Sequence, residues 1–349
     1  MYNFIQYFIS TDKIESSMKL LVTGGLGFIG SNFIIKLLKE RNDFEIVNVD
    51  AELLGSDKRN LGEIQNSERY QFVKGNITNK RLMEELISKC DAVINFAAES
   101  FVDRSINDAD PFLVSNIRGA FTILDITTKQ HKRMVQISTD EVFGSLASTS
   151  ATENFKFNPS SPYAATKAAA ELLINSYSIT YDSDVVITRC TNNYGPRQFA
   201  EKLIPKTIIL ANQNQKIPIY GKGSNIRDWI YVDDHCDAVL SILLKGKSGE
   251  SYNISANNEI DNLTLVKKIL EIMNKPQDLI ELVEDRPGHD LRYSMDSGKI
   301  SKDLGWKKNT NFNDGLNKTV EWYLRNPEIW KDIPSKILDV TPWKTSKKF

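Results

Sequence analysis

The sequence has few of the residues from which metal centres are built. It contains three histidines and three cysteines among 349 residues, and the histidines lie far apart. The cysteines, Cys90, Cys190 and Cys236, stand at no spacing typical of zinc ligands, and two of them lie within apolar runs. We therefore expect no metal site, and we interpret the cysteines as the reduced core thiols of a cytoplasmic protein.

An excess of charge of either sign is also missing, and so are long apolar runs. The 44 Lys and Arg residues nearly balance 45 Asp and Glu residues, for a net charge of −1. A balanced charge has no general attraction for nucleic acid or for an anionic membrane, so we expect neither as a partner. No stretch reaches the ~18 apolar residues of a membrane span, and the apolar start of the chain lacks the features of a signal peptide.

What the sequence does contain is a regular alternation of short apolar runs and helical patterns. The apolar runs lie at 19–22, 45–50, 70–73, 92–96, 134–138 and 185–190, with helical spacing near 28–40, 79–89, 111–130 and 163–181. Strands and helices that alternate at this interval form a parallel sheet covered by helices on both faces. The sequence therefore predicts an α/β fold with a doubly wound parallel sheet over residues 18–190.

The pattern changes beyond residue 190, where prolines interrupt shorter elements. Pro196, Pro205 and Pro218 fall among short strand-like and helix-like segments. We expect residues 191–330 to form mainly a smaller C-terminal α/β lobe that binds the substrate. Residues 1–17 are expected to be a loose N-terminal extension, and the polar, Pro-broken residues 331–349 a peripheral tail.

A glycine-rich turn separates the first predicted strand from the first helix. Gly24 permits the tight turn, Gly27 lets the backbone approach a pyrophosphate, and Gly30 allows the helix to pack closely on the strand. Asp50 ends the second predicted strand, 20 residues after Gly30. Its carboxylate would accept hydrogen bonds from a ribose hydroxyl and repel a 2′-phosphate, although a turn-capping aspartate is the alternative. The pattern is typical of a Rossmann-type dinucleotide site and predicts NAD rather than NADP.

A tyrosine and a lysine four residues apart predict a base that removes a proton from a hydroxyl group. Tyr163 and Lys167 project from one face of a predicted helix, which Ser161 and Pro162 begin. A nearby cationic lysine favours phenolate over phenol, which gives a base for the proton of a hydroxyl that loses hydride. The spacing is common by chance, but its place after the fifth predicted strand is the one that short-chain dehydrogenases use.

Two adjacent carboxyl groups after the fifth predicted strand exceed what the oxidation of an alcohol needs. Thr139, Asp140 and Glu141 follow the apolar run 134–138 directly. An added acid and an added base suggest that a molecule of water is also removed. Those roles need opposite protonation states, so the two environments must push the pKa values apart. The alternative is a solvated acidic pair at the end of a loop.

Together these motifs resemble those of the extended short-chain dehydrogenases and, within them, the dTDP-glucose 4,6-dehydratases. The resemblance runs from residue 18 to about residue 323. Besides the Tyr163–Lys167 motif, it rests on the segments 97–100, 102–105, 138–142, 192–196, 201–205, 225–229 and 285–290. UDP-glucose 4,6-dehydratases carry nearly the same motifs, so the base of the nucleotide stays open. One methyl group in a mostly apolar pocket contributes only ~1–3 kcal/mol of discrimination.

The resemblance implies a lyase that removes water from a nucleoside-diphosphate-glucose, with NAD transiently reduced and regenerated. Thr139 would hold the sugar 4-hydroxyl, and Tyr163, beside Lys167, would take its proton while hydride passes from C4 to NAD. Glu141 would then remove the C5 proton, and protonated Asp140 would give its proton to the leaving C6 hydroxyl. Return of the hydride to C6 would yield a 4-keto-6-deoxy sugar.

The resemblance also implies which residues surround the two ligands. On the cofactor side it places Gly24, Gly27, Phe28, Ile29, Gly30, Asp50, Asn76, Ile77, Ala97, Ala98, Ser115, Tyr163, Lys167 and Asn193. Around the nucleotide sugar it places Ser100, Thr139, Asn192, Lys202, Leu203, Pro218, Tyr220, Arg227, Asn262, Arg286 and His289. The planar guanidinium groups of the two arginines suit a diphosphate.

Five residues, at four places in the chain, depart from the family pattern. Phe101 stands where the family usually has His, so a polar contact near the substrate is lost. Asn76 replaces an Asp near the adenine, and its carbonyl is still expected to accept a hydrogen bond from the adenine amine. Phe143 replaces a Tyr, and residues 255–256 replace a Gly-Gly turn. None of these touches the predicted catalytic groups, so they bear on the nucleotide and on turnover but not on the reaction.

Two other functions are compatible with parts of the pattern. A nucleotide-sugar 4-epimerase, or another NAD-using relative such as a decarboxylase, shares the fold, Tyr163 and Lys167, but an epimerase does not need Asp140 and Glu141. A catalytically silent dinucleotide-binding or scaffold protein has no use for a complete set of proton-transfer groups.

The helical stretches 111–130 and 163–181 carry apolar residues beyond one face. These residues are Phe121, Ile123, Leu124, Ile126, Leu172, Leu173 and Ile174. In the family, two such helices pair across a two-fold axis, a closed contact of one surface with itself. The resemblance therefore implies a homodimer.

Overall fold

The computed structural model describes residues 17–338 and 342–344. The expected extension at residues 1–17 lies outside this part except for Ser17. The centre of the molecule is a seven-stranded parallel sheet in the order β10-β6-β5-β4-β1-β2-β3. Its strands are β1 (Met18–Thr23), β2 (Phe44–Asp50), β3 (Tyr70–Lys74), β4 (Ala92–Asn95), β5 (Arg133–Thr139), β6 (Val185–Cys190) and β10 (Ser251–Ile254). The predicted doubly wound α/β fold is confirmed.

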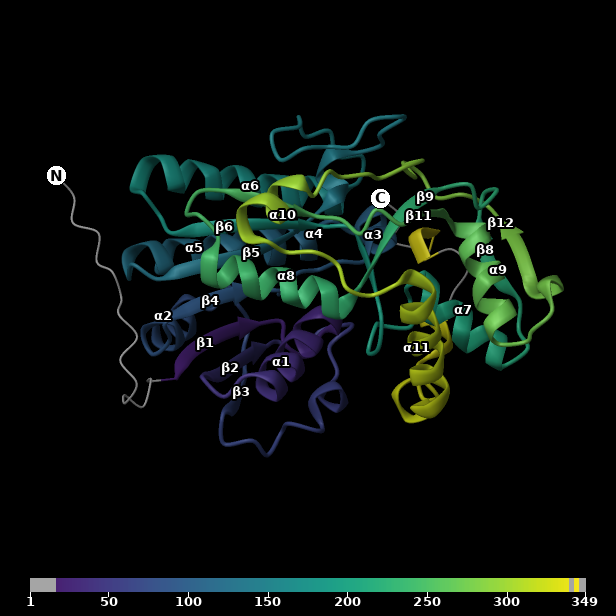
Figure 1. Cartoon of the computed structure of the whole chain (residues 1–349), viewed down its shortest axis with the longest axis horizontal. Helices are drawn as coiled ribbons and strands as arrows, with labels where there is room; N and C mark the ends of the chain where they lie inside the picture. Colours follow the sequence, from purple (N-terminus) through teal and green to yellow (C-terminus); the bar gives the residue numbers. More distant parts are fainter. Residues whose placement is uncertain (1–16, 339–341, 345–349) are drawn as a thin grey trace.

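Helices cover both faces of this sheet, which explains why its central strands β1 and β4 are buried and mostly apolar. In β1, Leu20 and Val22 face one cluster of buried side chains and Leu21 faces the other. The first cluster lies under α1 (Phe28–Glu40), α8 (Val232–Lys245) and α10 (Gly298–Leu304). The second lies under α2 (Lys80–Ser88), α5 (Ala120–Lys129) and α6 (Pro162–Tyr181). Figure 1 shows α8 and α1 on one side of the strands and α5 and α6 on the other.

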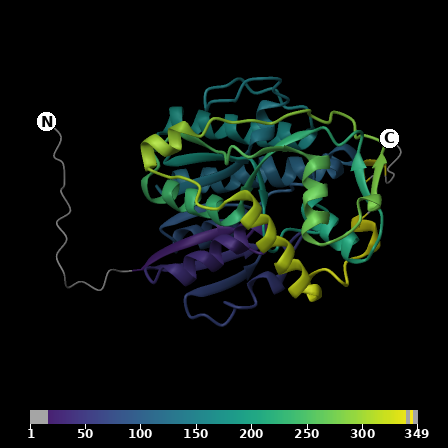
Figure 2. The same cartoon turned by 45° about the vertical axis from the view of Figure 1, so that its right-hand side comes forward.

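A smaller lobe stands beside the carboxyl ends of the large sheet (Figures 1 and 2). It contains one sheet in the order β11-β9-β7 and one parallel pair, β12 with β8. Its strands are β7 (Asn192–Tyr194), β8 (Ile217–Tyr220), β9 (Ile226–Tyr231), β11 (Glu259–Asp261) and β12 (Ile280–Val283). Its helices are α7 (Leu203–Asn212), α9 (Asn262–Ile272) and α11 (Phe312–Arg325). Three short helical segments follow β4 in the chain and lead into α5. They are α3 (Val102–Asn107), α4 (Asp110–Phe112) and the π-helical turn Leu113–Gly119.

The two lobes are not separate stretches of chain. β10 pairs in parallel with β6 and so belongs to the large sheet, although it lies within the expected lobe at residues 191–330. The expected peripheral tail at 331–349 also differs from what is seen in its described part. Ile337 is packed in the core of the lobe, and Trp343 is 8% exposed. Both differences come from contacts between segments far apart in the sequence, which local patterns do not carry.

A buried ion pair ties α6 to the large sheet. Glu171 of α6 is 0% exposed and accepts hydrogen bonds from Arg189 of β6 at 2.9 and 2.7 Å. Glu171 also accepts one from the hydroxyl of Ser138 in β5. The same guanidinium donates to the carbonyl of Glu153 at 3.0 Å and lies over the ring of Phe143. The pair therefore joins β5, β6 and α6 directly behind Thr139.

Among the described helices, none is long and apolar enough to cross a membrane.

Replacing Glu171 by Ala should leave the Arg189 charge buried without its partner. We expect the free energy of unfolding to fall by about 3–5 kcal/mol, the range for breaking a buried pair. Urea denaturation followed by circular dichroism measures this change. As a matched control, Glu85→Ala removes an exposed pair with Lys89 and should leave the urea midpoint unchanged. Equal midpoints for the two variants would contradict the role given to Glu171.

Candidate active site

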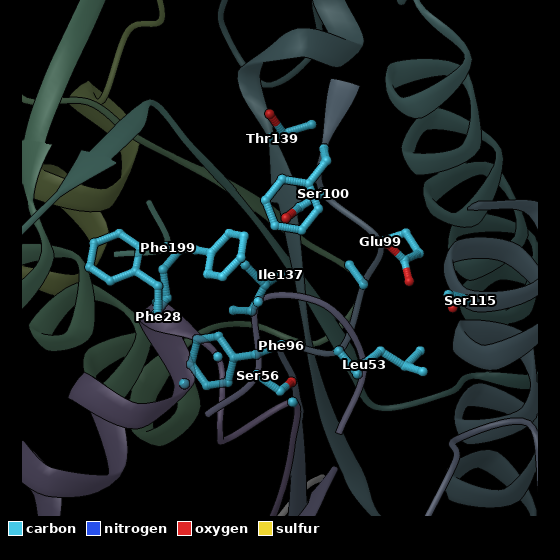
Figure 3. Close-up of a pocket in the computed structure, with 18 of the residues that line it drawn as sticks. Phe28, Leu53, Ser56, Phe96, Glu99, Ser100, Ser115, Ile137, Thr139 and Phe199 are labelled. Carbon is cyan, nitrogen blue, oxygen red and sulfur yellow. The ribbon is translucent and has the colours of Figure 1, made fainter. Parts of the chain in front are cut away.

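The main pocket lies at the carboxyl ends of the central strands, where parallel sheets bind their ligands. Its wall is built from the turn after β1, the ends of β2, β4, β5 and β6, and the start of α6. Figure 3 shows Thr139 at one end of this pocket and Ser56 at the other, with Phe28 and Ser115 on opposite sides. Every residue predicted to bind the cofactor lines it: Gly24, Gly27, Phe28, Ile29, Gly30, Asp50, Asn76, Ile77, Ala97, Ala98, Ser115, Tyr163, Lys167 and Asn193.

The glycine turn leaves room for a group that lies against the start of α1. Gly24 has φ +70°, and a Cβ there would lie 2.7 Å from the backbone of Ala97. A Cβ on Gly30 would lie 2.9 Å from the Cα of Gly25. At Gly27 a Cβ would meet only the Gly24 carbonyl, at 3.3 Å, and α1 begins there without a side-chain cap. The first backbone N–H groups of α1 are thus available to a phosphate, as the sequence predicted.

Asp50 is held rigidly at the wall of the pocket. Its carboxylate accepts hydrogen bonds from the N–H groups of Leu26 (3.1 Å) and Glu52 (2.8 Å) and from the hydroxyl of Ser56 (2.9 Å). The carboxylate therefore caps a turn, which was the alternative, and it also lines the pocket in which the ribose was expected. A carboxylate fixed in this way presents a negative charge to any ribose in the pocket.

Asn76 lies in the same pocket but is engaged differently from the expectation. Its side-chain carbonyl accepts hydrogen bonds from the N–H and the hydroxyl of Thr78, at 2.9 and 2.8 Å. Both lone pairs of that oxygen are thus in use, so the expected acceptance from an adenine amine is not available to it. Asn76 would have to serve a cofactor through its amide N–H groups instead.

Thr139, Asp140 and Glu141 stand where β5 turns into a short 3₁₀ segment. Thr139 Oγ1 accepts a hydrogen bond from the N–H of Glu141 (3.3 Å) and donates to Asp140 Oδ1 (3.1 Å). Asp140 is buried, and its Oδ2 has no hydrogen-bond partner among the described residues. All three residues line the main pocket, and Glu141 also lines the second pocket described below. The alternative of a solvated pair at a loop end is therefore wrong.

The environments of the two carboxyl groups differ in the way that the sequence required. Burial raises the pKa of Asp140 well above its usual range, and the charge of Glu141 raises it further. Burial also raises the pKa of Glu141, but the cations of Arg286, Lys202 and Arg227 oppose that rise. The pKa of Asp140 is thus raised more strongly than that of Glu141, which favours Asp140 as the proton donor and Glu141 as the base.

Tyr163 and Lys167 lie one turn apart on α6, and both line the main pocket. Ser161 caps the helix by accepting a hydrogen bond from Ala164 at 3.1 Å. Burial raises the pKa of Tyr163 well above its usual range, the charge of Glu141 adds to the rise, and a hydrogen bond with Thr139 opposes it.

The Lys167 ammonium donates instead to the carbonyl of Ile137 at 2.6 Å. Burial lowers the pKa of Lys167 to about 8, so its ammonium form still predominates at pH 7. The expected phenolate is thus not favoured by the protein alone. An additional positive charge beside the phenol is needed to favour it.

A second pocket continues the first into the smaller lobe, with Glu141, Asn192 and Lys202 on both. Ser100 and Thr139 lie on the first pocket, and the other residues predicted to bind substrate lie on the second. These are Asn192, Lys202, Leu203, Pro218, Tyr220, Arg227, Asn262, Arg286 and His289. The structure thus brings together residues from six segments that the sequence keeps far apart.

The second pocket contains polar atoms that the described residues leave without partners. They are the side-chain oxygens of Asn192, Gln198 and Asn262, Nε of Arg286 and Nε1 of Trp229. Buried polar groups are normally paired, so this group of atoms indicates a polar ligand. Burial lowers the pKa of His289 to about 4, so this ring is neutral near pH 7.

The cations of the second pocket are held in place by groups that the sequence did not single out. Arg227 stacks its guanidinium 4.1 Å from the centre of the Tyr293 ring and donates to the carbonyl of Asp290 at 2.9 Å. Arg286 pairs with Asp103 of α3 at 2.7 Å. Asp103 lies within the segment 102–105, so the match of that segment to the family pattern could have indicated it. Tyr293 follows the segment 285–290 and carried no signal of its own.

One departure from the family pattern, Phe101, and the thiol of Cys190 line the main pocket without a catalytic role. Phe101 is buried, packs on Phe199 at 5.5 Å between ring centres, and lies under the Lys202 ammonium at 5.0 Å. The cation therefore contacts a ring face where the family usually has His. Cys190 lines the main pocket, and burial raises the pKa of its thiol to about 12. Within the described residues, no cluster of three or more His, Cys, Asp or Glu is arranged to hold a metal ion.

The chain is similar to known proteins over most of its length. The model of a family described as GDP-mannose 4,6 dehydratase matches residues 21–319. The low-salt glycan biosynthesis protein Agl12 of Haloferax volcanii is 46% identical over 89% of this chain and its own full length. A dTDP-glucose 4,6-dehydratase of an Actinoplanes species is 43% identical over 90% of this chain and its own full length. The crystal structure of DesIV, a dTDP-glucose 4,6-dehydratase of Streptomyces venezuelae with NAD and TYD bound, superimposes with a TM-score of 0.88. DesIV is 42% identical, and the match covers 90% of this chain and 99% of that one.

The Asp50 carboxylate predicts a preference between the two nicotinamide cofactors. Calorimetric titration should show much tighter binding of NAD than of NADP, because a 2′-phosphate would meet a fixed negative charge. Asp50→Asn keeps a carbonyl for the N–H of Leu26 but removes the charge. We expect this variant to lower the ratio of the Kd for NADP to the Kd for NAD by about tenfold, equivalent to ~1.4 kcal/mol. Equal affinity of the unmodified protein for both cofactors would remove the assignment.

Proposed function

The chain belongs to the GDP-mannose 4,6 dehydratase family, and from this premise we propose that it is an NAD-dependent hydro-lyase acting on a nucleoside-diphosphate-glucose. The products are a 4-keto-6-deoxy sugar, still bound to its nucleotide, and water. The observation that carries the proposal is the pair formed by buried Asp140 and half-buried Glu141 where the two pockets meet. A binding protein without catalysis has no need of two pocket-lining carboxyl groups whose pKa values are shifted to different extents.

The first half of the reaction is an oxidation at C4 of the sugar. Thr139, whose hydroxyl interacts with Tyr163, orients the 4-hydroxyl, and Tyr163 takes its proton. Lys167 holds a positive charge behind the phenol. When bound, NAD supplies the acceptor for the C4 hydride, returns that hydride to C6 later, and brings the positive charge that favours the Tyr163 phenolate.

The second half removes water. The C4 ketone acidifies the C5 proton, which Glu141 takes as a general base. Asp140 gives its proton to the C6 hydroxyl, which leaves as water. Its Oδ2 has no other hydrogen-bond partner among the described residues. Glu141 then returns a proton to C5 while C6 receives the hydride. The net change is loss of one water with no net oxidation.

The nucleotide part of the substrate occupies the second pocket. Arg227 and Arg286 supply two positive charges to the diphosphate, and the unpaired Nε of Arg286 is a donor ready for it. We propose thymidine as the nucleoside, because the named relatives with over 40% identity include dTDP-glucose 4,6-dehydratases. Comparing turnover on dTDP-glucose with turnover on UDP-glucose tests this choice.

A 4-epimerase is the second candidate, since it would use the same fold and the same Tyr163. It has no task for an acid and a base beyond that tyrosine. The raised pKa of buried Asp140, next to Glu141 under the influence of three cations, favours the dehydratase. Incubation with NAD and a nucleoside-diphosphate-glucose, followed by mass spectrometry for the loss of water, distinguishes the two reactions.

Glu141→Gln separates oxidation from elimination. The variant keeps the shape of the site but loses the base for C5, so loss of water should slow by ~10²–10⁴. NADH absorbance should then build up on the enzyme, whereas Tyr163→Phe should prevent NADH from forming. Asp140→Asn should resemble Glu141→Gln, because the leaving hydroxyl loses its proton donor. Elimination by Glu141→Gln at the unmodified rate would rule out this role and favour the epimerase.

We further propose that the protein assembles as a homodimer through α5, α6 and the π-helical turn before α5. Of the apolar residues predicted there, Phe121 is 39% exposed and Leu172 60% exposed. Ile123, Leu124, Ile126 and Ile174 are instead buried within the subunit. Further exposed apolar side chains on the same segments extend the patch: Leu113, Val114, Ile179 and Tyr181. A second copy related by a two-fold axis would cover this face. We also propose the cytoplasm as its location, because its three cysteines are buried and unpaired.

Placing charge on the proposed interface should produce a monomer. Phe121→Glu combined with Leu172→Glu would bury two carboxylates opposite their symmetry copies, which opposes association. Sedimentation at micromolar concentration should give twice the chain mass for the unmodified protein and the chain mass for the variant. Leu282→Glu, at a side chain 57% exposed on β12 of the other lobe, is the control and should stay dimeric. A monomeric mass for the unmodified protein would refute the proposal.

A further inference from the structure

The C-terminal turn Pro342–Lys344 lies against the substrate pocket rather than at the periphery. Trp343 is 8% exposed and presents its ring to that of Tyr220 at 4.8 Å between centres and 89° between planes. The turn also packs along α3. In Figure 1 it is the short yellow turn between α3 and β8. A tryptophan buried in this way contributes packing energy and a defined ring geometry to whatever it touches.

Tyr220 connects this turn to the groups proposed to hold the diphosphate. Its ring lines the second pocket, and its hydroxyl donates to Asp103 Oδ2 at 2.9 Å. The other oxygen of Asp103 pairs with Nη1 of Arg286 at 2.7 Å. Trp343 itself does not line the pocket, so it stands behind the chain of contacts Tyr220–Asp103–Arg286.

The turn is fixed from both lobes. Lys344 forms an ion pair with Glu284, two residues before Arg286 in the same loop. A few residues earlier, Ile337 is buried in the core of the smaller lobe. The contact with α3 comes from the side of the large sheet. The turn therefore bridges the two walls between which the nucleotide would lie.

The family pattern does not include this turn. The family model ends its match at residue 319, whereas the turn begins at residue 342. The Haloferax and Actinoplanes relatives match over their own full length, but they cover only 89% and 90% of this chain.

We propose that Trp343 is a positioning residue of the substrate site, which holds Tyr220, and through Asp103 also Arg286, in place for the nucleoside diphosphate. The inference rests on the proposed function for the identity of that ligand. Trp343 touches neither the reacting sugar carbons nor the NAD pocket. Its loss therefore weakens the binding of nucleotide and leaves the chemical steps and the cofactor unaffected.

Calorimetric titration of the full-length protein with dTDP, and in parallel with UDP, tests this without any turnover. Trp343→Ala should raise the Kd for the nucleotide by about tenfold, equivalent to ~1.4 kcal/mol. The KM for the nucleotide sugar should rise in parallel, with kcat and the Kd for NAD within about twofold of the unmodified values. Trp343→Phe, which keeps a ring against Tyr220, should restore most of the affinity. Trp322→Ala, at a tryptophan of α11 outside both pockets, is the matched control and should leave the nucleotide Kd unchanged.

A second variant keeps the test independent of local misfolding at one site. Truncation after Leu338 should reproduce the Kd of Trp343→Ala, and Trp343→Ala should add little in a protein that already carries Tyr220→Ala. An unchanged nucleotide Kd in Trp343→Ala, or an equal loss of NAD affinity, would overturn the inference. If the unmodified protein binds neither dTDP nor UDP, the proposed function fails instead, which is a separate outcome.

Discussion

The site depends on one constraint: two adjacent carboxyl groups at the end of β5 are shielded from solvent. Burial alone would push both Asp140 and Glu141 toward their neutral forms. Arg286, Lys202 and Arg227 oppose this rise at Glu141, and Arg227 also opposes it at Asp140. These cations follow β6 in the chain, whereas the carboxyl groups follow β5. An acid and a base beside one another therefore exist only when the two lobes are together.

The parallel sheet is what makes such a meeting possible, because it brings all strand ends to one edge. α6 contributes to this edge in two ways. Its first turns carry Tyr163 and Lys167, and Lys167 donates to the carbonyl of Ile137 in β5. One turn later, Glu171 accepts hydrogen bonds from Ser138 of β5 and Arg189 of β6. The helix that carries the proton-transfer groups thus also fixes the strand that carries the carboxyl pair. A stable core and an accurately placed site have the same physical origin here.

Most of the fold was predictable from the sequence because its signals are local. A central strand buried on both faces is rich in apolar residues, as Leu20, Leu21 and Val22 of β1 show, and an amphipathic segment between two such runs is typical of a helix. The pairing of β10 with β6 was not predictable in this way, since β10 is a short run within an irregular region. The burial of the C-terminal turn depends likewise on Tyr220 and α3, which lie more than a hundred residues away.

By itself the sequence determined which chemical groups are present and at which strand ends they lie: the glycine turn, Asp50, the carboxyl pair and the Tyr163–Lys167 motif. These follow from residue type and spacing, which need no knowledge of distant contacts. Only the tertiary structure decided how each group behaves. The Lys167 ammonium is directed to the Ile137 carbonyl, so burial controls the pKa of Tyr163. Thr78 occupies the carbonyl of Asn76. Protonation and hydrogen bonding depend on what surrounds a group in space, and that environment comes from every part of the chain at once.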